Sequence, residues 1–328
     1  MFDWGCDLGW CCCGSFAVEE SCNASTVKRA IAEKLKMVIT NLIGGLGNQM
    51  FQYAAGRALS LEYGVPLHLD VSGFAAYDLH QGFELGRVFK GVFEIADAAD
   101  VRSILGWQYS PVIRRVVSRS SMAVFRHNAL VVEPHFHYWH GIKDVPSDCY
   151  LTGYWQSEKY FLNFAGQIRD DFSFSPMLEK QNTDLAKEII SSNAVSLHVR
   201  RGDYINNSKN VATYETCSLE YYQTAIQYVT ERMLKPRFFV FSDDIDWVKK
   251  HLKIDYPCIY VDHNHGAESY NDMRLMSMCR HNIIANSSFS WWGAWLNPST
   301  DKIVAAPKRW FAKETNTQDL IPKNWVRV

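Results

Sequence analysis

Short β-rich runs alternate with helical stretches throughout the second half of the chain, and this alternation limits the fold more than any other feature. The runs read AVSLHVR, RFFVFS, CIYVD, NIIAN and KIVAA, beginning at positions 194, 237, 258, 282 and 302. Between them lie SLEYYQTAIQYVTERM, DIDWVKKHL, ESYNDMRLMSMCR and FSWWGAWLN. Strands that alternate with helices are typical of a parallel sheet covered on both faces. The sequence therefore predicts a doubly wound α/β domain over residues 176–328.

A second α/β unit begins at Met37. The apolar run VITNLI is followed by a glycine turn, GGLGN, by a helical stretch, QMFQYAAGRALSLEYG, and by VPLHLD, which ends at Asp70. This order predicts a βαβ unit with parallel strands. Residues 71–175 contain many aromatic residues and show no clean period. We therefore predict two Rossmann-type domains facing a cleft, over residues 37–175 and 176–328.

The charge balance and the first residues exclude several classes of protein. The 328 residues include 34 Lys and Arg and 35 Asp and Glu, for a net charge of −1, which argues against a protein that coats nucleic acid. No run approaches the ~18 apolar residues of a membrane-spanning helix. Residues 1–36 lack the basic start and apolar stretch of a secretory signal, and acidic residues interrupt them. We expect them to be an extension outside the fold, and the location to be cytoplasmic.

Ligands of open α/β sheets bind beyond the carboxyl ends of the strands, and the first such end reads LHVRRGDY. In a strand, His198 and Arg200 point to one side, and Val199 and Arg201 to the other. An arginine fork before a glycine turn suits phosphate oxygens. A salt bridge to Asp203 is the alternative role for one of the two arginines. The pair favours a phosphate site.

Polar residues follow two further predicted strands. One residue of the pair Asp243 and Asp244 is expected to cap the next helix, and the other offers acceptors for the N1 and N2 groups of a guanine. The segment NSSFS, residues 286–290, opens the helix around SWWGAWLN. Backbone N–H groups and hydroxyls at such a start form an anion site, whereas plain capping by Ser288 or Ser290 is the structural alternative.

A partial dinucleotide motif leaves a rival function open. Gly45 and Gly47 stand where a dinucleotide fingerprint has its first two glycines, and Asp70 lies near the expected acidic position. Met50 replaces the third glycine, so the match is incomplete. An NAD-dependent oxidoreductase is thus one rival reading. A non-catalytic carbohydrate-binding protein is another, because aromatic residues make up 14% of the chain.

Histidines and arginines cluster in the poorly patterned region. His135, His137 and His140 have a metal-like spacing, but only Glu133 is near enough in sequence to add a ligand, and we expect no metal. From Val101 to Val132 there are five arginines and no acidic residue. This stretch is either a solvated face or a dock for an anionic membrane surface.

Four separated blocks together resemble a known family. The blocks GGLGNQMFQYAAGRAL, HVRRGDY, FSDD and NSSFSWWGAWLN are similar to those of the bacterial α-1,2-fucosyltransferases of glycosyltransferase family 11. The resemblance runs from about Met37 to the C-terminus. It implies a GT-B-like α/β fold, GDP-β-L-fucose as donor, and no metal. It also implies inverting transfer of fucose to O2 of a terminal galactose in surface-glycan assembly, lipopolysaccharide O-antigen or capsule, on a free or lipid-linked acceptor.

The resemblance also implies roles for individual residues. Arg200 would hold the β-phosphate, His198 would touch the nucleoside, and Asp244 would read guanine. The phosphate pocket and the facing turn would include Ser287, Ser288, Phe289, Gly45 and Gly47. Asn48 would face the fucose from across the cleft. Inversion is a single displacement, and Asp203 is the candidate base for the acceptor hydroxyl, or else it orients Arg200 or Arg201.

Overall fold

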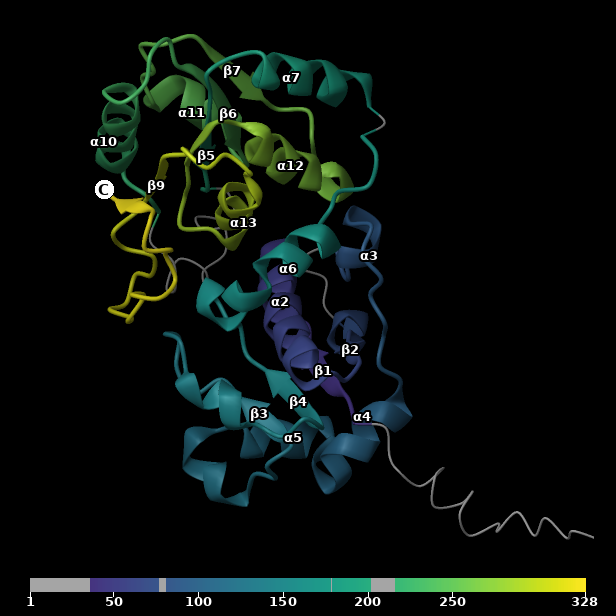
Figure 1. Cartoon of the computed structure of the whole chain (residues 1–328). Coiled ribbons are helices and arrows are strands. Elements are labelled where there is room, and N and C mark those ends of the chain that lie inside the picture. Colours follow the sequence, from purple (N-terminus) through teal and green to yellow (C-terminus); the bar gives the residue numbers. More distant parts are fainter. Residues whose placement is uncertain (1–35, 77–80, 178, 202–215) are drawn as a thin grey trace, which may run out of the picture. The chain divides into compact units, whose positions relative to one another are not determined.

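Two parallel β-sheets organise the computed structural model of the chain (Figure 1). The structure describes residues 36–76, 81–177, 179–201 and 216–328. Residues Met37–Val328 form one compact unit that contains both sheets.

The first sheet has the strand order β2-β1-β4-β3, and every pairing in it is parallel. Its strands are β1 (Val38–Asn41), β2 (Leu67–Asp70), β3 (Leu130–Val132) and β4 (Cys149–Thr152). Alternate side chains of β1 go to opposite faces, as strand geometry requires. Val38 joins the core beneath helix α2 (Leu46–Tyr63), whereas Ile39 joins the core beneath α4 (Ala98–Leu105) and α5 (Pro111–Val117). The sheet is therefore covered on both faces.

The second sheet has the order β10-β9-β8-β5-β6-β7, again with parallel pairing throughout. Its strands are β5 (Ala194–Val199), β6 (Arg237–Ser242), β7 (Cys258–Val261), β8 (His281–Ile283), β9 (Val304–Ala306) and β10 (Val326–Arg327). Strand β5 is buried along its whole length, as expected for a central parallel strand.

Helices cover both faces of this second sheet as well. The longer helices are α7 (Lys180–Ile190), α10 (Leu219–Thr230), α11 (Ile245–His251), α12 (Tyr270–Met278) and α13 (Ser288–Leu296). Residues of α10 and α11 share one apolar cluster with Val195 and Leu197, and residues of α7 and α12 share another with Phe239 and Phe241. The remaining helices are α3 (Leu85–Val88), α6 (Ala165–Asp171) and the 3-10 helices η1 (Ser72–Ala76), η2 (Gly106–Tyr109), η3 (Ser120–Phe125), η4 (His140–Asp144), η5 (Glu158–Tyr160), η6 (Leu162–Phe164) and η7 (Gly266–Glu268).

Helix α13 packs into the core of the first sheet. Its Trp291 and Trp292 are fully buried and pack against Phe51 of α2 with tilted rings, at ring-centroid distances of 4.5 and 5.0 Å. The indole of Trp292 donates to the carbonyl of Gly47 at 3.0 Å, and that of Trp291 donates to Leu320 at 2.8 Å. These contacts hold the start of α13 against the glycine turn before α2.

The predicted fold class is confirmed, because the chain is an α/β protein with two parallel sheets. Every strand and helix predicted in the second half is present, with ends shifted by a few residues. In residues 71–175 the sequence pattern missed β3 and β4, which have only 3 and 4 residues. The predicted boundary between the two domains, at residues 175 and 176, stays a prediction. No helix of the described part is long and apolar enough to cross a membrane.

Candidate active site

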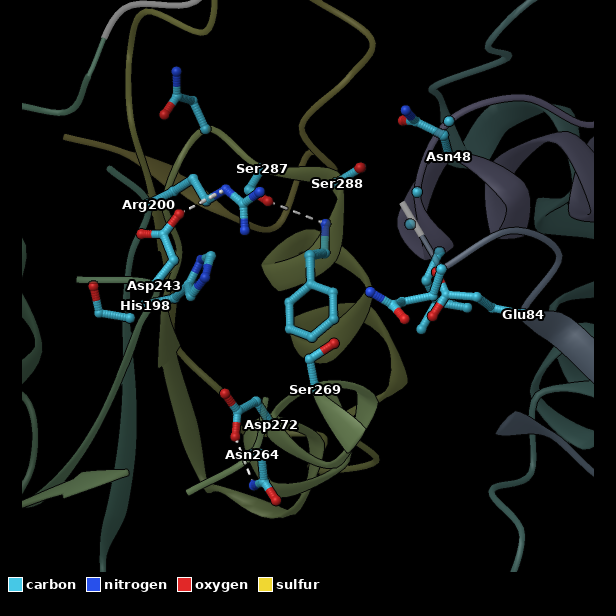
Figure 2. A pocket seen from close by; sticks show the side chains of 18 of the residues that line it. Asn48, Glu84, His198, Arg200, Asp243, Asn264, Ser269, Asp272, Ser287 and Ser288 are labelled. Atoms are coloured by element: carbon cyan, nitrogen blue, oxygen red, sulfur yellow. Dashed lines mark hydrogen bonds and ion pairs between the residues drawn. The ribbon is translucent and has the colours of Figure 1, made fainter. Parts of the chain in front are cut away.

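The carboxyl ends of both sheets open into one cavity of about 530 Å³ (Figure 2). This volume suits a sizeable organic ligand. Residues 44–48, Gln81, Glu84, Tyr154 and Gln156 line it from the first sheet's side. The residues that line it from the second sheet's side are His198, Arg200, Ser242, Asp243, Asn264, His265, Gly266, Ser269, Asp272, Asn286, Ser287, Ser288, Phe289 and Trp310. Figure 2 shows Asn48 and Glu84 facing His198, Arg200 and Asp243 across this space.

His198 and Arg200 reach the cavity because they lie on the same side of strand β5 and its continuation. The Nε of Arg200 lies 3.2 Å from Oδ2 of Asp243, which follows the neighbouring strand β6. An ion pair through Nε fixes the plane of a guanidinium and leaves its two terminal nitrogens on the other edges. The Arg200 side chain is about a quarter exposed, so it meets the cavity without being sealed from it.

The Arg201 side chain points away from the cavity, as the alternation of side chains along a strand predicts. Its guanidinium carbon lies 4.0 Å from the ring centre of Trp247, and its Nε lies 3.6 Å from Asp244. Its backbone N–H donates to Asp243 at 2.8 Å. Arg201 is not among the lining residues, and its contacts are those of a structural cation.

The two neighbouring aspartates lie in different surroundings. Asp244 is the N-cap of α11 and accepts the backbone N–H of Trp247 at 3.2 Å, and it is not among the residues that line the cavity. Asp243 does line it and holds Arg200. The sequence predicted that one aspartate caps the helix and that the other offers acceptors to a ligand. It contained no signal that assigns these roles to Asp243 or Asp244.

The start of α13 forms another part of the cavity lining. Ser287 is the N-cap, and its hydroxyl accepts the N–H of Phe289 at 3.3 Å. The structural alternative, plain capping by Ser288 or Ser290, named the wrong serines, because the helix begins at Ser288 and Ser287 caps it. Ser287, Ser288 and Phe289 all line the cavity, and the Phe289 ring lies 6.0 Å from that of His198.

The glycine turn before α2 faces the start of α13. Gly45 is the extended N-cap of α2, and no side chain caps this end. A Cβ on Gly47 would lie 2.6 Å from the backbone carbon of Ser288, so only glycine allows this approach. The Asn48 side chain accepts from Nε2 of Gln156 at 2.8 Å, which orients its amide at the cavity edge. Gly45, Gly47 and Asn48 thus lie where the sequence placed them, across from the second sheet.

Two carboxyl groups in the lining were missed by the sequence. Glu84 is only 5% exposed, and burial raises its pKa although Arg87 pairs with it at 3.0 Å. Burial also raises the pKa of Asp272 to about 7, against a hydrogen bond from Asn264 at 2.8 Å that lowers it. Neither residue follows a predicted strand, so the search of strand ends passed over both.

The alternative motifs find structural explanations. Asp70 accepts the hydroxyl of Tyr150 at 2.6 Å and the N–H of Ser72 at 2.9 Å, which occupies the carboxylate that a dinucleotide ribose would need. The rings of His135 and His137 stack at 3.5 Å. Among the described residues, no three His, Cys, Asp or Glu side chains gather as metal ligands would. Asp203 lies outside the described residues.

Comparisons with known proteins match the fold and the sequence. The chain is 37% identical to an Escherichia coli alpha-1,2-colitosyltransferase over 90% of its length and 99% of the relative. It is 34% identical to the O-antigen biosynthesis glycosyltransferase WbnK of Escherichia coli, over 88% of this chain and 99% of that one. The pig (Sus scrofa) galactoside alpha-(1,2)-fucosyltransferase 2 is 24% identical over 78% of this chain and 68% of its own.

A solved structure and a family model agree with these relatives. The fucosyltransferase NodZ from Bradyrhizobium superposes with a TM-score of 0.52, covering 79% of this chain and 92% of that one at 16% identity, which supports the GT-B-like fold. The model of "Glycosyl transferase family 11" matches residues 138–328. The resemblance predicted from the four sequence blocks is confirmed: this glycosyltransferase, related to the galactoside α-1,2-fucosyltransferases, belongs to glycosyltransferase family 11.

Proposed function

We propose that the enzyme transfers L-fucose from GDP-β-L-fucose to O2 of a terminal galactose, with inversion, during surface-glycan assembly. The observation that carries this proposal is the cavity itself. It joins an arginine held at a strand end to the start of α13, which offers N–H groups and hydroxyls, and it faces a glycine-rich turn. A nucleoside diphosphate needs positive charge and N–H donors of this kind.

Arg200 would bind the β-phosphate of the donor. As the bond from the sugar C1 to the phosphate oxygen breaks, negative charge grows on the departing GDP, so contacts there strengthen in the transition state. The ion pair with Asp243 supports this role, because it fixes the guanidinium through Nε. Ser287, Ser288 and Phe289 would provide the rest of the phosphate pocket. Positive charge from side chains and helix N–H groups would do the work that a metal does in other transferases.

The nucleoside would lie along the second sheet and the sugar near the first. His198 would contact the nucleoside, and Asp243 takes over the guanine contact expected of Asp244, because Asp243 is the aspartate in the lining. Each of its oxygens has a second lone pair after its contacts with Arg200 and Arg201. Asn48 would bind the fucose from the opposite side, with Gly45 and Gly47 allowing close approach.

The acceptor would enter over residues 37–175. Its O2 attacks C1 from the face opposite the phosphate, GDP departs, and the acceptor hydroxyl loses its proton. Asp203 remains the candidate base. Glu84 is the buried carboxyl on the first sheet's side of the cavity, which makes Glu84→Gln the matched comparison for Asp203→Asn. Loss of kcat in only one of the two variants would show which of the two carboxyl groups the reaction needs. We place the reaction in the cytoplasm, where GDP-sugars are made.

One observation favours a second donor. The E. coli relative at 37% identity is named an alpha-1,2-colitosyltransferase. Colitose is fucose without its 3-hydroxyl, so the two donors differ by a single oxygen. A site that binds the 3-hydroxyl through buried polar groups rejects the deoxy sugar by a factor of about 10⁴, whereas a site without such groups discriminates weakly.

The test is a transfer assay read by mass spectrometry. GDP-fucose and GDP-colitose are each offered with a panel of β-galactosides, and kcat/KM is measured for both donors. We expect fucosyl transfer to O2 of galactose as the faster reaction. A higher kcat/KM for GDP-colitose would assign the second donor, and absence of transfer from either donor would overturn the proposal. Galactosides methylated at O2 provide the control for the attacking hydroxyl.

A further inference from the structure

The outer layer over one face of the first sheet has an unusual surface. Helices α4 and α5, with the 3-10 helix η2, cover the face of the sheet that carries Ile39 and Tyr150, η3 follows α5, and Figure 1 shows α5 beside β3 and β4. Their inward residues are buried, among them Val101, Ile104 and Val117. The layer therefore shares a core with the sheet, and its outward residues are not part of that core.

Large apolar side chains point outward from this layer. Those with the highest exposure are Val124 at 86%, Val112 at 73%, Phe125 at 61% and Trp107 at 58%. Val116 is also exposed. Scattered single apolar residues are normal on a protein surface, but a group of them on consecutive short helices marks an interaction site.

Arginines interleave with these apolar side chains. On α5, Val112, Arg115 and Val116 follow the spacing of one helix face, and Arg119 follows two residues after the helix ends; all four are exposed. Arg102 on α4 is exposed too. No acidic residue occurs from Val101 to Val132, so the exposed charge contributed by this stretch is positive.

The other two arginines of the stretch serve the fold. Arg114 lies over the Tyr150 ring at 4.9 Å and 3.6 Å from Asp70, and its side chain is 18% exposed. Arg126 donates to the carbonyl of Val117 at 3.1 Å. Arg115 and Arg119 are exposed, and so is Arg102, whose guanidinium carbon lies 4.8 Å from the ring centre of Tyr109.

We propose that this surface, which we call the basic apolar face, docks the enzyme on a bilayer that contains anionic lipids. We define it by Arg102, Trp107, Val112, Arg115, Val116, Arg119, Val124 and Phe125. Aliphatic and aromatic side chains that enter the headgroup boundary, with arginines beside them, match the chemistry of an anionic lipid surface. A protein partner would need an acidic patch of its own, and the lipid surface supplies negative charge everywhere. This proposal is independent of the sugar donor.

The test is flotation of the full chain with lipid vesicles. We expect binding to vesicles of phosphatidylcholine with about 30 mol% phosphatidylglycerol and much weaker binding to phosphatidylcholine alone. Raising the salt to about 0.5 M should release most of the protein, because the attraction is screened. Equal binding to both kinds of vesicle, or to neither, would overturn the proposal.

Variants distinguish binding through the basic apolar face from a general effect of the protein's charge. The double variant Arg115→Glu/Arg119→Glu should weaken binding about 30-fold or more, at about 1 kcal/mol per arginine, and Val124→Asp should weaken it further. The matched control is Lys250→Glu/Lys323→Glu, which reverses two exposed lysines elsewhere and should change binding by less than a factor of three. All variants should keep the wild-type Tm and wild-type transfer to a free acceptor. Equal losses in both double variants would disprove docking through this face.

Self-association is the competing use of the same surface. Sedimentation velocity without lipid should give a monomer for the wild type. A dimer that Arg115→Glu/Arg119→Glu dissociates, together with no vesicle binding, would assign the face to a second copy of the chain and overturn lipid docking.

Discussion

The two sides of the cavity differ in chemistry. The charged wall, made by His198, Arg200 and Asp243 at the ends of β5 and β6, carries an ion pair. The amide wall on the first sheet's side, made by Gly45, Gly47, Asn48 and Gln156, has no ionisable side chain and is held by an amide–amide hydrogen bond; the carboxyl group of Glu84 lines the cavity outside this wall. The first is suited to hold and release a charged leaving group, and the second to approach a neutral sugar closely. Substitutions on the charged wall should therefore change the rate of the chemical step. Substitutions on the amide wall should lower activity by displacing the residues that line the cavity.

The largest effect is expected from Arg200→Lys. A lysine keeps the charge but loses the two parallel hydrogen bonds of the guanidinium fork. Loss of a partner in a desolvated charge pair costs on the order of 2–5 kcal/mol. At ~1.4 kcal/mol per tenfold change, kcat/KM should fall roughly thirtyfold to several-thousandfold. Activity above about a third of wild type would remove Arg200 from the phosphate site.

Arg201→Lys is the control for that variant. Arg201 packs on Trp247 and away from the cavity, so its loss should appear as a lower Tm with a small change in kcat/KM. Equal loss of activity in both variants, tracking loss of Tm, would mean that the arginines act through folding alone.

The amide wall is tested by Gly47→Ala. The added Cβ would meet the backbone of Ser288 at 2.6 Å and push α13 away from α2. Overpacking of this kind costs about 1–3 kcal/mol of stability, and a displaced site costs up to about 100-fold in rate. Gly166→Ala is the control, since a Cβ at Gly166 meets nothing within 4 Å. If both variants have wild-type kcat/KM, the close approach of the two helices is not needed for activity.

A smaller effect concerns Asp272, a lining carboxyl that forms no ion pair with any described residue. Burial raises its pKa from the usual 3.8 to about 7, so between these pH values the folded state binds a proton that the unfolded state has released. Stability should therefore fall as pH rises through this window. The variant Asp272→Asn has no carboxyl group to ionise at this position, so it should lack this fall in stability. The Tm of the variant minus that of the wild type should grow more positive from pH 5 to pH 8, and a constant difference would show that Asp272 does not titrate in this range.

The smallest effect is expected from chelation. If the charged wall alone neutralises the leaving diphosphate, EDTA should leave kcat/KM unchanged within about a factor of two. Complete loss of transfer in EDTA, restored by Mn²⁺ or Mg²⁺, would show that Arg200 and the start of α13 are insufficient.

The charged wall was largely accessible to sequence reasoning. Strand alternation predicted that His198 and Arg200 share a side and that Arg201 does not, and both lining positions follow from it. The period-2 geometry of a buried strand is a local property, so a single sequence carries it. The choice between Asp243 and Asp244 was not accessible, because it depends on which residue the chain turns outward at the first turn of α11.

The first sheet's contribution was only half accessible. The glycine turn and Asn48 stand in a clear strand–turn–helix pattern, but Glu84, Tyr154 and Gln156 come from the region without a period. Their positions depend on strands of 3 and 4 residues and on contacts far apart in sequence, such as the one from Gln156 to Asn48. Tertiary packing, which leaves no local signature, decides these positions.

The tryptophans of α13 limit how enzymes of this family can be recombined. Trp291 and Trp292 belong to the same core as α2, and Trp310, Leu320 and Trp325 complete it from the C-terminal segment. A chimera that takes residues 37–175 from a relative, in order to exchange the acceptor, would set foreign side chains against these rings. Such a graft should fold only if residues 288–296 and 310–325 come from the same parent as α2. Such an exchange therefore needs two crossover points, one near residue 175 and one before residue 288, rather than a single one between the sheets.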